Sequence, residues 1–153
     1  MSTAILSDLE IGKAAEHLVV ADLILSGHRA YLTDQGLPYD VVIDCAGTLY
    51  RLQVKATRAA KRLPGRNALG MGYLFHVRRA GKGGRRQYAD NEFDIIALVA
   101  MDIRVIAYLP FYDSVLQTIH LRPPGYQHHA RAERRRNIDQ FPIETTIAVL
   151  AGK

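Results

Sequence analysis

Apolar and polar positions alternate between residues 40 and 55, and this alternation predicts a β-hairpin. Folded about Ala46 and Gly47, the hairpin places Asp40 opposite Gln53. Successive side chains of a strand point to opposite faces of the sheet, so one face of the hairpin is apolar. The apolar face consists of Val41, Ile43, Cys45, Tyr50, Leu52 and Val54.

The opposite face of the hairpin gathers polar side chains at its open end. Asp40, Gln53 and Lys55 bring together a carboxylate, an amide and an ammonium group, a set suited to a cation and a phosphate. The alternative is an ordinary amphipathic hairpin whose outer face is solvated. Asp44 shares this face, but four residues of strand separate it from Asp40 by roughly 13 Å, too far to share one ion with Gln53 and Lys55.

A capping box formed by Ser7 and Glu10 predicts a helix over residues 8–26 that ends at Gly27. Glu16 lies among apolar neighbours of this helix, where a carboxylate needs a partner. The apolar residues form two stripes, so we expect the helix to be covered on two sides. The first stripe is Ile11, Ala14, Ala15, Leu18, Ala21 and Leu25, and the second is Leu9, Val20 and Leu23.

The later elements are predicted from shorter patterns. The order of helix and strands predicts an α+β or mixed α/β fold in a single domain over residues 1–153, with its core at about 8–117. The apolar segment 143–150 fits either a strand or a helix. Strands are expected at 28–33, 73–78, 93–100 and 104–109, a short helix at 112–117 and a basic helical turn at 130–136.

Composition adds an uneven distribution of charge. The net charge is +5, and the stretch from Cys45 to Ala89 has no Asp or Glu but holds eleven of the 20 basic residues. Such a field favours a polyanion, although basic loops that merely keep the protein soluble are the alternative. The predicted nucleic-acid contacts are Arg58, Lys61, Arg62, Arg66, Arg78, Arg79, Lys82, Arg85 and Arg86.

Several classes of protein fit the sequence poorly. Cys45 stands alone, so we expect a buried thiol and no intrachain disulfide. The N-terminus lacks a signal-type apolar core and the longest apolar runs are too short to span a bilayer. A cytoplasmic protein, or one that works inside a host cell, without a membrane partner is therefore expected. The glycine-rich segment 81–86 lacks the spacing of a P-loop, and His120, His128 and His129 lack that of a structural zinc site.

Three positions together carry a resemblance to a known family. Glu16 on the first helix, Asp40 at the start of a strand and Gln53-Val54-Lys55 on the next resemble the PD-(D/E)XK nuclease superfamily. The likeness is greatest to homing endonucleases associated with group I introns, which are similar in using Gln, and more distant to archaeal Holliday junction resolvases. It covers about residues 9–110 and implies a restriction-endonuclease-like core, a mixed central sheet flanked by helices.

The resemblance implies a metal-dependent DNA endonuclease that hydrolyses phosphodiester bonds with Mg²⁺ or Mn²⁺. Asp40 would be the main ligand, assisted by the side-chain oxygen of Gln53 and the backbone carbonyl of Val54. Glu16 would hold a water or a second cation, and Lys55 would orient the attacking water. Because one site cuts one strand, a homodimer or larger symmetric homo-oligomer is expected if both strands are cut.

Other functions stay open at the level of sequence. A Holliday junction resolvase would use the same site on a four-way junction. A nuclease fold that binds DNA without cutting it is favoured by Gln53, which stands where the superfamily usually has an acid. A weaker alternative is an RNA-directed nuclease or an interaction protein whose basic stretch is only a solvated surface.

Overall fold

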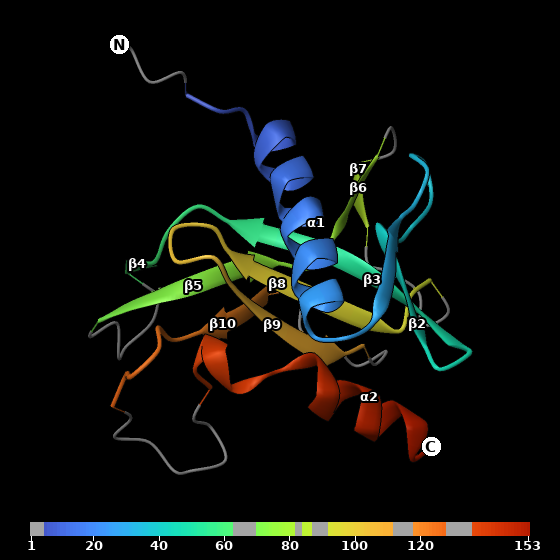
Figure 1. Ribbon diagram of the computed structural model, residues 1–153. Helices are drawn as coiled ribbons and strands as arrows, with labels where there is room; N and C mark the ends of the chain where they lie inside the picture. Colours follow the sequence, from blue (N-terminus) through green and yellow to red (C-terminus); the bar gives the residue numbers. More distant parts are fainter. Residues whose placement is uncertain (1–4, 63–69, 82–83, 87–91, 112–117, 128–135) are drawn as a thin grey trace.

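The computed structural model describes residues 5–62, 70–81, 84–86, 92–111, 118–127 and 136–153, with backbone alone at 79–81 and 84–86. The expected helix at 112–117 lies outside these residues, as does all but the last residue of the helical turn at 130–136. The described elements in chain order are α1 Asp8–Leu25, β1 Arg29–Leu32, β2 Val41–Cys45, β3 Thr48–Thr57, β4 Lys61–Arg62, β5 Met71–His76, β6 Arg79–Gly81, β7 Gly84–Arg86, β8 Ile95–Ala100, β9 Val105–Pro110, β10 Thr118–Leu121, a 3₁₀ turn Ile138–Gln140 and α2 Ile143–Ala151 (Figure 1).

The centre of the fold is a mixed five-stranded sheet in the order β1-β2-β3-β8-β9. β3 and β8 run parallel, and the other neighbouring strands are antiparallel. All six residues of β8 are buried, because both faces of the sheet are covered at its middle. An α+β fold with a mixed central sheet, as the sequence predicts, is confirmed.

The predicted hairpin is formed by β2 and β3. Cys45 pairs with Thr48 and Val41 with Leu52, so the next position places Asp40 opposite Gln53, in the register that the alternation predicts. Ala46 in the connecting turn has a φ of 53°, a left-handed conformation that costs a residue with a Cβ about 1–2 kcal/mol.

Helix α1 begins as predicted but buries a different stripe. Ser7 and Glu10 form the capping box, with the Ser7 N–H donating to Glu10 Oε2 at 2.7 Å. The fully buried positions are Ala15, Val19 and Leu23, one turn apart. The prediction of cover on two sides was wrong, since Leu9 and Leu25 of the two predicted stripes are 81% and 88% exposed. The helix lies flat on one face of the sheet, so a single stripe meets the core.

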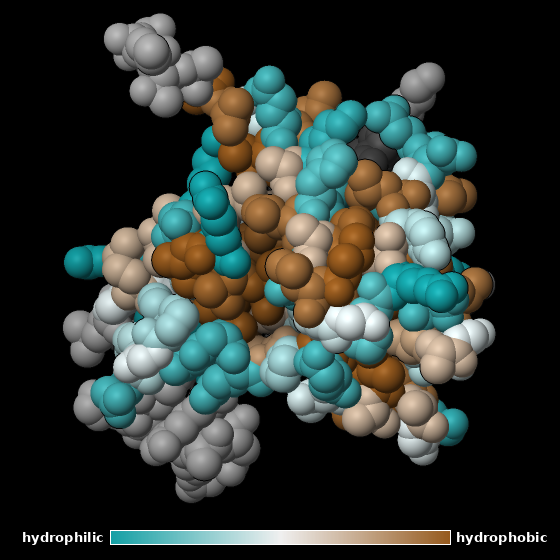
Figure 2. Space-filling model, viewed as in Figure 1, coloured by the Kyte–Doolittle hydropathy of each residue, from teal (hydrophilic) through white to brown (hydrophobic). Residues whose placement is uncertain are grey.

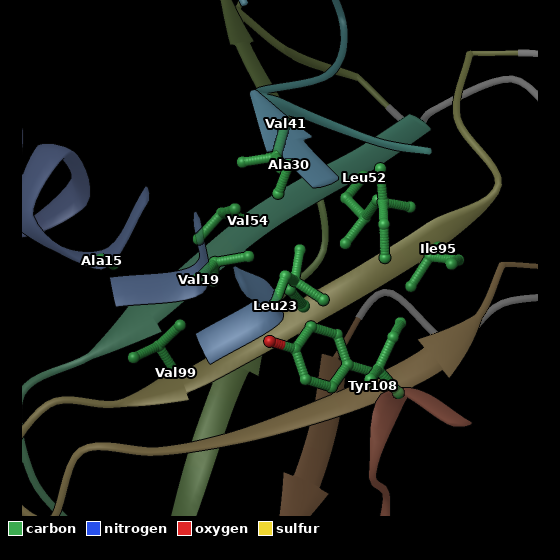
Figure 3. Close-up of a cluster of buried hydrophobic side chains, with 13 residues drawn as sticks. Ala15, Val19, Leu23, Ala30, Val41, Leu52, Val54, Ile95, Val99 and Tyr108 are labelled. Carbon is green, nitrogen blue, oxygen red and sulfur yellow. The ribbon is translucent and has the colours of Figure 1, made fainter. Parts of the chain in front are cut away.

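Two apolar clusters occupy the two faces of the central sheet. α1 and α2 cover one face, where Val19 and Leu23 pack with Tyr108 and strand residues (Figure 3). The other face is covered by the three-stranded sheet β10-β5-β4, which contributes Tyr73 and Phe75. The molecule therefore has three layers, and the hairpin that bears the polar residues lies in the middle one (Figure 1).

The second helix settles the segment that sequence left open. Residues 143–151 form α2, whose Thr146 hydroxyl donates to the Tyr108 carbonyl at 2.7 Å. The Tyr108 hydroxyl in turn donates to Asp22 Oδ2 at 2.6 Å on α1, so Tyr108 links the two helices. Neither α-helix in the described part of the chain has the length and apolar character needed to cross a membrane.

Candidate active site

Asp40 stands immediately before β2, where hydrogen bonds hold both its backbone and its side chain. Its backbone N–H donates to the Leu52 carbonyl at 2.8 Å, continuing the ladder of the hairpin. Its Oδ2 accepts from Gln53 Nε2 at 2.6 Å and from the Val54 N–H at 2.9 Å. Asp40 and Gln53 are therefore in contact, as predicted, and the hydrogen bonds fix the orientation of the carboxylate.

The amide of Gln53 is turned differently from the expectation. Its Nε2 donates to Asp40 and, at 3.3 Å, to the Val54 carbonyl, while only 8% of the residue is exposed. In this arrangement the amide nitrogen, not the oxygen expected as a metal ligand, faces the carboxylate. The side chain thus orients Asp40. Because an amide is neutral, it does not add the negative charge that an acid would bring to this position.

Glu16 approaches Asp40 from the helix. Both line a hollow of about 310 Å³ between α1 and the loop that joins β1 to β2. Burial and then the charge of Asp40 raise the pKa of Glu16, while Lys13 acts to lower it. Burial also raises the pKa of Asp40, against the lowering effects of the Val54 N–H and of Lys55. Each carboxylate is therefore more costly to ionise than it is in water.

Lys55 lies on β3 beyond Gln53 and is largely enclosed. Its Nζ donates to the Arg78 carbonyl at 3.1 Å, at the end of the segment that follows β5. Burial lowers the pKa of Lys55, and the opposing charge of Asp40 acts to raise it. The ammonium and the carboxylate are thus near enough to influence each other, as the predicted site requires.

The donor set suits a hard divalent cation. Glu16, Asp40 and the Val54 carbonyl offer oxygen atoms, the ligands that Mg²⁺ and Mn²⁺ prefer. No three His, Cys, Asp or Glu side chains among the described residues gather closely enough to form a metal site by themselves. Two partly buried carboxylates that repel each other would nevertheless gain from a cation between them.

The basic residues predicted to contact DNA occupy several places. Arg58 follows the last residue of β3 and reaches the start of α1, donating to the Leu6 carbonyl at 2.7 Å and to Asp8 Oδ1 at 2.9 Å. Lys61 and Arg62 are exposed on β4, and Arg78 is exposed beyond β5. The backbones of Arg79, Arg85 and Arg86 belong to the β6–β7 hairpin, whereas Arg66 and Lys82 lie outside the described residues.

Polar residues set aside on sequence grounds have other surroundings. Asp44 accepts a hydrogen bond from the Gly47 N–H at 2.7 Å and so closes the hairpin turn. Cys45 is half-buried, with its Sγ 3.9 Å from His28 Nδ1. Gln35 is exposed and lines the same hollow as Asp40. His128 and His129 lie outside the described residues.

Among the lining residues of the hollow that the sequence did not predict are two on α1 beside Glu16. Gly12 and Lys13 line it together with Glu16, on the same side of α1. The signal was their spacing of four and three residues before Glu16, which places all three on neighbouring positions of a helix surface.

Comparison with known proteins now identifies the family. The family model described as PD-(D/E)XK endonuclease matches residues 6–141. Among solved structures, the bacterial homing endonuclease I-Ssp6803I is similar with a TM-score of 0.71 and 18% identity, covering 96% of each chain. No curated protein matches the sequence. The family model spans most of the chain and the neighbour shares its fold, and the chain belongs to the PD-(D/E)XK endonuclease family.

Proposed function

We propose that this protein is a DNA endonuclease that depends on Mg²⁺ or Mn²⁺. The observation that carries the proposal is the fixed Asp40 carboxylate, which accepts from Gln53 and Val54 beside Glu16 in one hollow. Family membership supports nuclease chemistry, and the named neighbour is itself a homing endonuclease. We further propose that residues 1–153 form one nuclease domain.

Each proposed residue has a part in the hydrolysis of a phosphodiester. Asp40, Glu16 and the Val54 carbonyl would hold the cation, which when bound neutralises phosphoryl charge and lowers the pKa of water. Gln53 would keep the Asp40 carboxylate in place through its amide N–H. Lys55 would orient the attacking water and stabilise negative charge that develops on phosphorus-bound oxygens.

The substrate and the assembly follow from the same chemistry. The exposed basic residues Lys61, Arg62 and Arg78 would contact the DNA backbone without selecting a sequence. A single site cuts a single strand, so a symmetric homo-oligomer would be needed for a double-strand break. The cell compartment proposed from the sequence is the cytoplasm.

A plasmid nicking assay tests the proposal. We expect the wild type to convert supercoiled DNA to nicked or linear forms in Mg²⁺ or Mn²⁺, and to stop when EDTA is added. Lys55→Met should lower the rate about a hundredfold or more, since it removes the ammonium. Lys153→Met, which removes an exposed lysine at the C-terminus, is the control and should cleave normally.

One alternative function has a specific observation in its favour. Gln53 reduces the negative charge available to a cation, which would suit a protein that binds DNA without cutting it. That protein would bind a labelled duplex, lose affinity as salt is raised and leave plasmid DNA intact in both metals. Preferential cutting of a four-way junction would instead identify a Holliday junction resolvase.

A further inference from the structure

The feature that the proposed chemistry leaves unused is Gly12, in the second turn of α1. A glycine inside a helix is less stable than alanine, because it has more freedom to lose on folding. Nothing in the fold requires it, since its φ is not in the left-handed region and an added Cβ would meet no atom within 4 Å. Helix stability alone would therefore favour alanine at this position.

The space that Gly12 leaves open belongs to the hollow of Glu16 and Asp40. The walls of this hollow are mixed in character. Leu9 of α1 and Leu37 of the facing loop line it and are 81% and 45% exposed. Apolar and polar surfaces adjoin over the first turns of α1 (Figure 2). Such walls fit a ligand that has apolar groups beside polar ones.

Lys13 supplies positive charge to a hollow whose other charged lining residues are the acids Asp8, Glu16, Asp34 and Asp40. It lines the hollow beside Gly12, and its charge is near enough to Glu16 to act on that carboxylate. A DNA strand that approaches these four carboxylates would be repelled along its phosphates unless a cation met the neighbouring phosphate. Lys13 is placed to do so, one turn of helix before Glu16.

We propose that the strand to be cut lies along α1 in this hollow, with its backbone passing over Gly12, a flanking phosphate at Lys13 and sugars against Leu9 and Leu37. This inference rests on the proposed nuclease function and says where the DNA strand lies on the protein surface. Gly12 acts by leaving room for the strand, and Lys13 acts as a binding residue outside the reacting atoms.

Substitution at Gly12 separates stability from DNA binding. Gly12→Ala and Gly12→Gln add better helix formers in open space, so the thermal midpoint should be unchanged or higher. We expect the side chain of Gly12→Gln to obstruct the strand, lowering plasmid cleavage and affinity for a fluorescein-labelled duplex at least tenfold. Gly12→Ala, with one added carbon, should lower both by a smaller factor.

The matched control places the same side chain on the far face of α1. Ala21 is exposed and lies nine residues from Gly12, about 900° of helix, hence on the opposite side. Ala21→Gln should cleave and bind as the wild type does. If Gly12→Gln also does so, the proposed path is wrong. If it instead changes the sedimentation coefficient without affecting DNA, a second copy of the chain occupies the hollow and the path is again overturned.

Substitution at Lys13 tests the phosphate contact. Lys13→Gln should weaken duplex binding and reduce the slope of log affinity against log salt by about one. Arg29→Gln removes another exposed cation, on β1 and outside the lining of this hollow, and should leave the slope unchanged. An unaltered slope in Lys13→Gln overturns the contact. If the wild type binds but never cleaves, the proposed function fails, while these binding measurements still decide the strand path.

Discussion

The two ends of the β2–β3 hairpin carry an aspartate on the same face, yet only one of them resembles an active site. At the open end, Asp40 receives donors from Gln53 and Val54 and faces a hollow of about 310 Å³. At the turn end, Asp44 lines a larger hollow of about 710 Å³, but its carboxylate accepts from the Gly47 N–H. The volume of a hollow is therefore a poorer guide to function than the hydrogen bonds that its carboxylates make.

The thiol at the turn end supports the same distinction. Burial, and secondarily Asp44, raise the pKa of Cys45, so its nucleophilic thiolate is disfavoured. At the open end, by contrast, the opposite charges of Asp40 and Lys55 moderate each other's shifts in pKa. Asp40 and Lys55 thus favour each other's charged forms at the open end, whereas the Asp44 carboxylate at the other end accepts a hydrogen bond within the turn.

The largest expected effect comes from exchanging each aspartate for asparagine. Asp40→Asn should lower the plasmid nicking rate about a thousandfold, because the main ligand loses its charge. Asp44→Asn should stay within about twofold of the wild type, because its turn is remote from the reaction. Equal losses in both variants would contradict the comparison.

The Asp40→Asn variant also separates the effect of the carboxylate on stability from its effect on activity. The folded pKa of Asp40 is raised, so this carboxyl stabilises the fold at pH below its unfolded pKa, and that contribution is lost as the pH rises through the folded pKa. Asp40→Asn should therefore be more stable than the wild type at neutral pH, as measured by thermal melts. A lower melting midpoint at pH 7 would show that the carboxylate instead holds the hairpin together.

The second prediction concerns charge at the open end. Gln53 Nε2 now lies 2.6 Å from Asp40 Oδ2. In Gln53→Glu a carboxylate oxygen would take the place of this nitrogen, and repulsion between the two carboxylates would raise the pKa of the pair. Stability should then fall as the pH rises above about 4, with a loss of about 2 kcal/mol at pH 7. Chemical denaturation at several pH values measures this loss.

Added Mg²⁺ should restore much of the stability lost in Gln53→Glu and should raise the wild-type midpoint less. Binding to the folded state alone produces such a shift, which grows with ligand concentration. Leu49→Gln, an exposed change on the same strand near the turn, serves as the control. A variant whose melting curve does not respond to Mg²⁺ would place the cation elsewhere.

The smallest expected effect is at the turn. Ala46 has a φ of 53°, which asparagine adopts at lower cost than alanine. Ala46→Asn should raise the free energy of unfolding by about 0.5–1 kcal/mol and leave the nicking rate unchanged. A change in the rate would reveal that the turn communicates with the site.

Local parts of the fold were predictable because neighbouring residues determine them. The capping box at Ser7 and the register of β2 with β3 follow from short patterns, and both agree with the structure. The buried face of α1 did not follow, because the contact with the sheet selects Val19 among several apolar positions. The apolar pattern of residues 143–150 is compatible with a strand or a helix, and the packing of this segment against β9 selects the helix.

The candidate site divides in the same way. Strand alternation brings Asp40 opposite Gln53, so their meeting could be predicted. The orientation of the Gln53 amide depends on the Asp40 carboxylate and the Val54 carbonyl around it. The bond from Lys55 to the Arg78 carbonyl joins residues 23 positions apart, and no local pattern anticipates it. Lys13 was not predicted, because among the charged residues of the helix only Glu16 stands out against the apolar pattern.

The parallel pairing of β3 with β8 also has a consequence for the order of folding. Leu52 pairs with Ile95, so the intervening chain must close a long loop before this ladder forms. The β2–β3 hairpin closes a short turn and can form first, on the microsecond scale of isolated hairpins. Until β8 arrives, the apolar edge of β3 stays unpaired and open to other chains. Aggregation during refolding should therefore depend on how quickly β8 docks.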